Sequence, residues 1–112
     1  MALIRALTAS GGGVSSYTEQ SISCPEGTEV TKNIGFDADY VLVKTNAGNM
    51  YQFDTNVNPS NVIFYASNGT YSTTRTVGAS NGYIKSVGSG QVIISNVSGS
   101  GWSSFDLYAF KF

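Results

Sequence analysis

Apolar and polar residues alternate in short runs along most of this chain, from about residue 15 to Phe112. The runs are rich in β-branched and aromatic residues, which fit a pleated, half-buried surface. A period of two is typical of a strand with one buried face, and no segment shows a convincing helical period. The pattern predicts about nine short strands, over residues 17–24, 30–36, 40–44, 51–54, 62–66, 71–77, 83–87, 92–94 and 105–112.

The pattern inside single runs predicts where they lie in a sheet. Residues 40–44 and 62–66 are apolar on both faces. The first should therefore be a central strand, and β-branched and aromatic residues disfavour the alternative of one helical turn in the second. Weak alternation over 17–24 predicts an edge strand. In 30–36, Lys32 falls on the apolar side, which predicts a bulge or a late change of face.

Turns rich in Ser, Asn and Gly separate the runs. Ser67-Asn68-Gly69 and Ser80-Asn81-Gly82 each lie between two runs. Asn-Gly tolerates the positive φ angles of a type I′ turn, so both segments predict tight hairpins. Gly88-Ser89-Gly90 predicts a further hairpin into the next run. Residues 56–61, which include Pro59, predict a loop.

The spacing of the turns, roughly ten residues, is typical of a sandwich or a barrel. We predict an all-β fold, an antiparallel β-sandwich with a jelly-roll-like topology. A length of 112 residues favours one domain. We place that domain at residues 14–112, preceded by an N-terminal arm and Gly-rich joint at residues 1–13.

Both ends of the chain carry apolar side chains that predict contacts between subunits. Leu3, Ile4 and Leu7 lie in the arm, which three consecutive glycines tether to the domain. The arm can pack on its own domain as an edge strand, or exchange onto an adjacent subunit. Phe110 and Phe112 lie in the last predicted strand, so that end should be tied into the sheet or into an interface. We predict that these five side chains contact neighbouring copies.

Charge and hydropathy exclude two classes of partner. The chain has six Lys and Arg and a net charge of −1, and its cations are scattered. Nucleic-acid binding needs several cations on one face, so we expect no nucleic-acid partner. No stretch approaches the roughly 20 apolar residues that span a membrane. The apolar arm is too short for a signal peptide, which predicts synthesis in the cytoplasm.

The residue types disfavour an enzyme. Histidine is absent, which removes the usual base at neutral pH and the usual zinc ligand. The seven acidic residues show no pairing that a glycosidase would need. Asp37, Asp39 and Asp54 form the only acidic concentration; Ca²⁺ wants six or more oxygens, so a solvated turn is favoured over a metal site. We expect no catalytic residues, no metal and no cofactor.

Cys24 is the only cysteine, so an intrachain disulfide is impossible. We interpret it as a buried apolar filler, with an interchain disulfide as the alternative. Asn68-Gly69-Thr70 and Asn96-Val97-Ser98 match the glycosylation sequon. Without a secretory signal we interpret them as turn and strand residues.

Aromatic residues make up 12% of the chain and are the best indication of a binding function. Trp102 lies in a Gly-rich turn, and Tyr71 and Tyr83 follow the two Asn-Gly turns. A ring on a loop can stack on a sugar, with Asn68 and Asn81 supplying hydrogen bonds. This predicts a carbohydrate-binding module. The alternative is that Trp102 caps the core and the tyrosines lie half-buried on strands.

The strands that are apolar on both faces favour a third function, because one small core cannot cover them all. The surplus would be buried between subunits of a structural or assembly protein. The opening residues 1–13, MALIRALTASGGG, resemble the start of small structural proteins encoded in phage and prophage late regions. Residues 105–110, FDLYAF, resemble the closing strand of small tail, baseplate or capsid-decoration domains.

The resemblance implies a virion protein, commonly a β-sandwich in a trimer or ring, whose partners are itself, other virion proteins and in some cases host surface glycans. We predict a non-enzymatic phage structural protein that forms homo-oligomers. A carbohydrate-binding module is the alternative.

Overall fold

The computed structural model describes residues 14–67, 69 and 72–112. This part of the chain contains nine strands and no helix. The strands are β1 (Ser16–Ser23), β2 (Glu29–Asn33), β3 (Tyr40–Thr45), β4 (Met50–Asp54), β5 (Asn58–Tyr65), β6 (Ser72–Thr76), β7 (Ile84–Gly88), β8 (Gln91–Ser95) and β9 (Ser104–Lys111).

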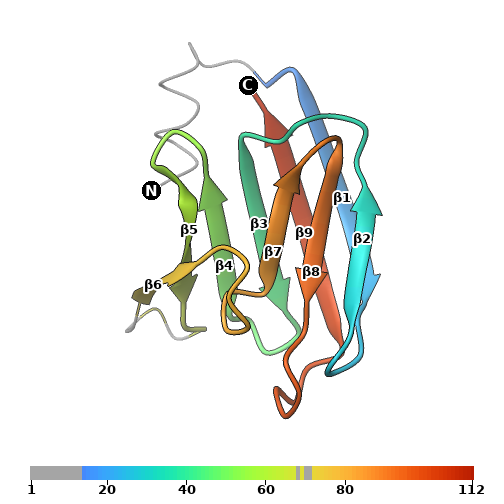
Figure 1. The fold of residues 1–112 in the computed structure, drawn as a ribbon, viewed down its shortest axis with the longest axis vertical. Helices are drawn as coiled ribbons and strands as arrows, with labels where there is room; N and C mark the ends of the chain where they lie inside the picture. The colour runs from blue at the N-terminus through green and yellow to red at the C-terminus, as the bar shows by residue number, and fades with distance from the viewer. Residues whose placement is uncertain (1–13, 68, 70–71) are drawn as a thin grey trace.

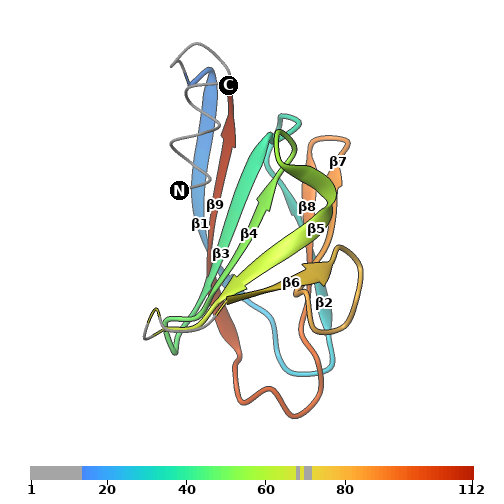
Figure 2. The same ribbon diagram turned by 90° about the vertical axis from the view of Figure 1, so that its left-hand side faces the viewer.

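The strands form two antiparallel sheets that pack face to face (Figure 1). The larger sheet has six strands in the order β1-β9-β3-β4-β5-β6, and the smaller has three in the order β2-β8-β7. Figure 2 shows that the larger sheet twists so that β6 turns toward the side of the smaller sheet, while the upper ends of β1 and β9 extend past it. The predicted all-β antiparallel sandwich is confirmed.

Two pairs of strands bring the first part of the chain beside the last part. β1 pairs with β9 in the larger sheet, and β2 pairs with β8 in the smaller one. Strands β3 to β6 then continue within the larger sheet. A jelly roll divides eight strands between two sheets through two Greek keys. The jelly-roll topology stays a prediction.

The core lies between the sheets and is filled by alternate side chains. Val41 and Val43 of β3 and Leu107 of β9 are fully buried, and Val92 and Ile94 of β8 face them from the smaller sheet. The predicted positions of two strands are confirmed, because β1 lies at an edge and β3 lies between β9 and β4. The last strand, β9, lies between β1 and β3, so this end of the chain is tied into the sheet.

The predicted loop at residues 56–61 is wrong, because β5 begins at Asn58. The pairing of β4 with β5 jumps from Phe53↔Val62 to Asp54↔Asn58, so β5 has three extra residues at this point. Pro59 is one of the three. Its missing N–H group removes no hydrogen bond to β4 there, which is where a strand tolerates proline.

The predicted strand at 30–36 is too long. β2 ends at Asn33, and its pairing with β8 is continuous from Glu29 to that residue. The chain then turns at Gly35, which has a φ of +82°. Lys32 is half-buried on the inner side, opposite Val92.

The predicted tight hairpin at Ser80-Asn81-Gly82 is wrong, because β6 and β7 belong to different sheets. The segment crosses from one sheet to the other. A side chain at Gly82 would clash with the backbone, since a Cβ atom there would lie 2.8 Å from the Thr76 carbonyl oxygen. The φ angle of Gly82 is not positive, so the glycine is required by this close contact. The residue with the positive φ is Tyr83, at +62°.

The type I′ geometry occurs instead between β7 and β8. Ser89 and Gly90 have φ angles of +54° and +72°, as both central residues of that turn require. The hairpin predicted at Gly88-Ser89-Gly90 is therefore confirmed. β5 and β6 are also consecutive antiparallel partners, and between them the Gly69 N–H donates to the Ala66 carbonyl oxygen at 3.0 Å, so a hairpin joins them where Ser67-Asn68-Gly69 predicted one. Residues 68, 70 and 71 of this connection lie outside the described residues.

Asn96 is buried, at 2% exposed, and links three segments at the base of the sandwich. Its side-chain nitrogen donates to the carbonyl oxygens of Cys24 and Trp102, both at 2.8 Å. Its side-chain oxygen accepts from the Ser100 hydroxyl at 2.8 Å. The interpretation of this sequon asparagine as a structural residue agrees with its burial.

We expect Asn96→Ala to lower the free energy of unfolding by about 2–4 kcal/mol, because two carbonyl oxygens in a buried setting lose their donor. Urea denaturation measures this change. Asn33→Ala is the matched control; the side chain of Asn33 is exposed and should matter by less than about 0.5 kcal/mol. Equal effects of the two substitutions would contradict a linking role for Asn96.

Candidate functional site

The aromatic residues predicted to stack on sugars lie against the core. The side chain of Tyr83 is only 4% exposed, and its ring lies 5.2 Å from that of Trp102 and 4.7 Å from that of Tyr51. The prediction that Tyr83 offers a ring face to a glycan is wrong, because other rings cover it. Trp102 is half-buried and packs on the core, as the alternative interpretation had it.

The other predicted glycan contacts do not form a site with these rings. Asn81 is exposed, and its carbonyl oxygen accepts a hydrogen bond of 2.7 Å from Arg75. That guanidinium also lies 4.2 Å from the ring centroid of Phe64, so it covers the core. Asn68 and Tyr71 lie outside the described residues.

The outer face of the larger sheet, which points away from the smaller sheet, carries a second set of aromatic rings. The register places Tyr17 of β1 beside Phe110 of β9, and Phe110 beside Tyr40 of β3. The ring centroids lie 4.8 Å and 5.8 Å apart, and Phe112 stacks on Phe110 at 6.2 Å. We call Tyr17, Tyr40, Phe110 and Phe112 the outer aromatic cluster.

The members of this cluster differ in exposure. Tyr17 is 50% exposed, whereas Phe110 and Phe112 are half-buried. Tyr40 is buried beneath them, and its hydroxyl donates a hydrogen bond of 2.8 Å to the side-chain oxygen of Gln52. Two of the five predicted subunit contacts, Phe110 and Phe112, thus lie together on one face. Leu3, Ile4 and Leu7 lie outside the described residues.

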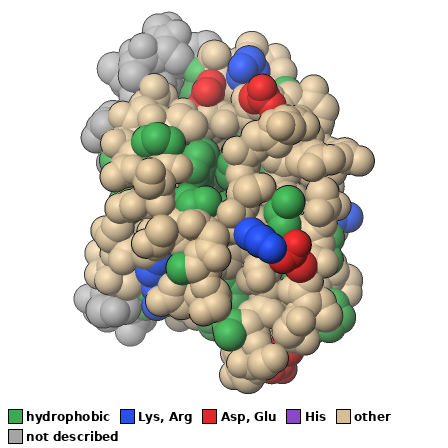
Figure 3. Space-filling model, in the orientation of Figure 1, with side chains coloured by type: hydrophobic (Ala, Val, Ile, Leu, Met, Phe, Trp, Pro, Cys, Tyr) green, Lys and Arg blue, Asp and Glu red, His purple; other side chains and the backbone are tan. Residues whose placement is uncertain are grey.

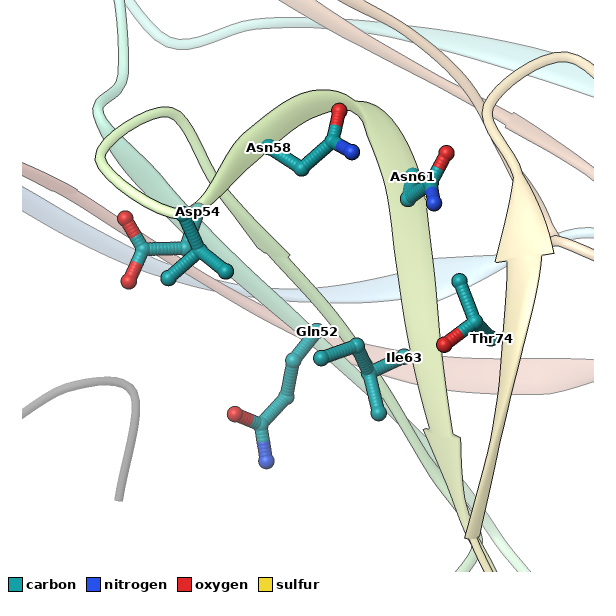
Figure 4. A pocket seen from close by; sticks show the side chains of 7 residues that line it. Gln52, Asp54, Asn58, Asn61, Ile63 and Thr74 are labelled. Carbon is teal, nitrogen blue, oxygen red and sulfur yellow. The ribbon is translucent and has the colours of Figure 1, made fainter.

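A pocket of about 250 Å³, lined by both polar and apolar side chains, lies on the same face, over β4, β5 and β6 (Figure 4). One register row crosses it, from Gln52 through Ile63 to Thr74. The whole lining consists of Gln52, Asp54, Val57, Asn58, Asn61, Ile63 and Thr74. We call it the outer polar pocket.

The acidic residues near the pocket and at the start of β3 serve the backbone. Asp54 accepts the N–H of Asn56 at 2.9 Å. Asp37 accepts the N–H of Gly90 at 2.8 Å, and Asp39 accepts that of Phe112 at 3.0 Å. These last two carboxylates therefore hold a hairpin and the end of β9 in place. Among the described residues, no group of three or more His, Cys, Asp or Glu side chains could hold a metal ion.

Cys24 is fully buried, with its sulfur 3.5 Å from the carbonyl oxygen of Thr28. This position agrees with the interpretation of the residue as an apolar filler. A disulfide to another chain would first have to bring the thiol out of the core.

On the smaller sheet's side of the molecule most of the visible surface is neither charged nor hydrophobic (Figure 3). Charged side chains are few there. In the described part of the chain, no helix is long and apolar enough to cross a membrane.

No protein-family model, curated protein or solved structure matches this chain. The geometry of the outer face, together with the sequence, therefore carries the functional proposals.

Sequence reasoning missed most of the outer polar pocket. In the sequence, Asp54 stands out only as part of an acidic concentration with Asp37 and Asp39, Gln52 carries no signal of its own, and Asn58 and Asn61 fall in a predicted loop. The usable signal was the surplus of amide and carboxyl groups around Pro59. Tyr17 and Tyr40 were not grouped with Phe110, because only the register brings them together.

Burial raises the pKa of Tyr40 and of Tyr51 well above the ordinary tyrosine value of 10.0. For Tyr40 the nearby carboxylate of Asp54 raises the pKa further. Both phenols therefore stay protonated in the folded chain at a pH where the unfolded chain ionises.

We expect the free energy of unfolding to be insensitive to these two groups below pH 10 and to fall above it, because the unfolded state then binds fewer protons. The slope is about 1.4 kcal/mol per pH unit for each fully retained proton. Urea denaturation from about pH 9 to about pH 11.5 measures it. Tyr40→Phe should make the fall shallower, and an unchanged slope would contradict the assignment.

Proposed function

We propose that this chain is a non-enzymatic structural protein of a phage particle that assembles with copies of itself through the outer aromatic cluster. The observation that carries the proposal is the row of rings across β1, β9 and β3, which lies outside the core and ends in the half-exposed Tyr17. Aromatic side chains dominate the energetics of protein interfaces.

The surroundings of the cluster favour a protein interface. A stable interface buries at least about 1,000 Å² in total, more than four rings supply. The next register row extends the surface, because Tyr108 lies beside Leu42 and both are half-buried on the same face. Glu19 lies at the exposed edge of that row, where a polar rim is expected.

A second copy of the chain is the favoured occupant. A net charge of −1 with few charged groups gives little electrostatic repulsion between copies. The N–H of Ser15 bonds to the carbonyl oxygen of Lys111 at 2.7 Å, so the described chain begins beside Phe110 and Phe112. The arm that carries Leu3, Ile4 and Leu7 is therefore attached next to the cluster.

The location in a virion, and contacts with other virion proteins, are supported by the resemblance of residues 1–13 and 105–110 to small phage structural proteins. Residues 105–110 lie in β9, which is a central strand. The proposal extends to a ring or trimer of copies at the surface of the particle.

We expect Tyr17→Ser to raise the dissociation constant of the oligomer by about tenfold or more, because the most exposed ring of the cluster is lost. Sedimentation velocity across a concentration series measures the constant. Thr31→Ser is the control, since Thr31 is exposed on β2 of the smaller sheet, which does not carry the cluster. Equal effects of both substitutions, or a wild-type chain that stays monomeric at every concentration, would contradict the proposal.

We expect deletion of residues 1–10 to weaken the oligomer more than it lowers the free energy of unfolding of the monomer, because the arm then contributes across the interface. Sedimentation and urea denaturation of the same preparation measure the two quantities. The reverse result would show that the arm is an ordinary strand of its own sheet.

A further inference from the structure

We propose that the outer polar pocket binds one ring of a neutral saccharide. This site is distinct from the loop around Trp102, and it is formed by residues of three neighbouring strands and the β4–β5 connection. The ligand class follows from how the backbone opens the pocket, from the chemistry of its lining and from its size.

The irregular pairing of β4 with β5 opens the pocket. With continuous pairing, Asp54 would lie opposite Asn61; instead it pairs with Asn58, and the three residues between Asn58 and Val62 arch outward. Figure 4 shows Asn58 and Asn61 along this arch, with Gln52 and Ile63 side by side below it and Thr74 on the adjacent strand.

The lining matches hydroxyl groups. Asn and Gln amides both donate and accept, a carboxylate accepts, and a threonine hydroxyl does either. Sugar hydroxyls need both kinds of partner. Two of the amides are held in place, because Gln52 accepts from Tyr40 at 2.8 Å and Asn58 accepts from the Ser60 N–H at 2.9 Å. In both cases this bond fixes the amide oxygen, and the NH₂ group of Asn58 lies on the arch with that of Asn61 (Figure 4).

The charge of the lining excludes anions. Asp54 is the charged residue among the described lining side chains, and it is 5% exposed. A phosphate or a carboxylate would meet its negative charge with no lining cation to compensate. Ile63 and Val57 add an apolar surface for the C–H groups of a ring.

The size limits the ligand to a single ring. A volume of about 250 Å³ lies just below the usual range for sites that enclose drug-sized molecules. No aromatic side chain is among the described lining residues. We therefore expect a dissociation constant on the order of 1 mM for a monosaccharide, which is weak binding that relies on hydrogen bonds.

The test is a two-dimensional NMR titration of the ¹⁵N-labelled full chain with glucose, galactose, mannose and N-acetylglucosamine in turn. We expect at least one of them to shift the amide signals of Asn58, Asn61 and Thr74 in a saturable way. Glycerol and glucose 6-phosphate serve as the polyol and anion controls. Mapping by residue reads out the pocket whether or not the chain assembles, so this test is independent of the assembly proposal.

Substitutions in the pocket sharpen the test. Asn61→Ala and Thr74→Val should each raise the dissociation constant by about tenfold, because each removes a partner for the ligand. Asn61 is half-buried and Thr74 is exposed, so neither substitution should unfold the chain. The matched controls Asn33→Ala and Thr31→Val alter the same residue types on the smaller sheet and should leave binding unchanged.

Four outcomes would overturn the proposal. They are the absence of any saturable shift, an equal response to glycerol, a response to glucose 6-phosphate alone, and shifts confined to the loop around Trp102. The last of these would instead support the sugar-stacking site predicted from the sequence.

Discussion

The larger sheet has apolar side chains on both of its faces, but the smaller sheet covers only one of them. The rest of the structure depends on this constraint. Strand β9 shows the constraint: Phe105, Leu107 and Ala109 point into the core, whereas Tyr108 and Phe110 point outward. Burial of apolar area is the main favourable term in folding. The inward set therefore holds the sandwich together, and the outward set remains for other contacts.

The outer face changes in character from β1 toward β6. Over β1, β9 and β3 it carries the rings of the outer aromatic cluster, whereas over β4, β5 and β6 it carries amides, a carboxylate and a hydroxyl together with the apolar side chains of Ile63 and Val57. The hydrogen bond from Tyr40 to Gln52 joins these two parts of the face. The two proposed surfaces are therefore neighbours on one face of the sheet.

Local chemistry predicted the strands well and their connections less well. Short runs of β-branched and aromatic residues between turn residues located all nine strands, and the both-sided apolar pattern of residues 40–44 placed β3 inside a sheet. The prediction of a tight hairpin from Asn-Gly was wrong at Asn81 and Gly82, because that segment connects two sheets. Glycine is required there because the Thr76 carbonyl oxygen lies too close to allow a Cβ atom. The type I′ geometry appeared instead at Ser89 and Gly90, where two paired strands required it.

The sequence by itself determined that the chain is all-β, which residues alternate between the faces of each strand, and that histidine chemistry is absent. Those properties depend on residue type and on a local period of two. Only the tertiary structure decided that Tyr83 is buried, that Tyr17, Phe110 and Tyr40 lie in one row, and that the arch of β5 opens a polar pocket. Each of these depends on which distant strands pair and in what register, and the pattern within one segment does not specify its partner strand.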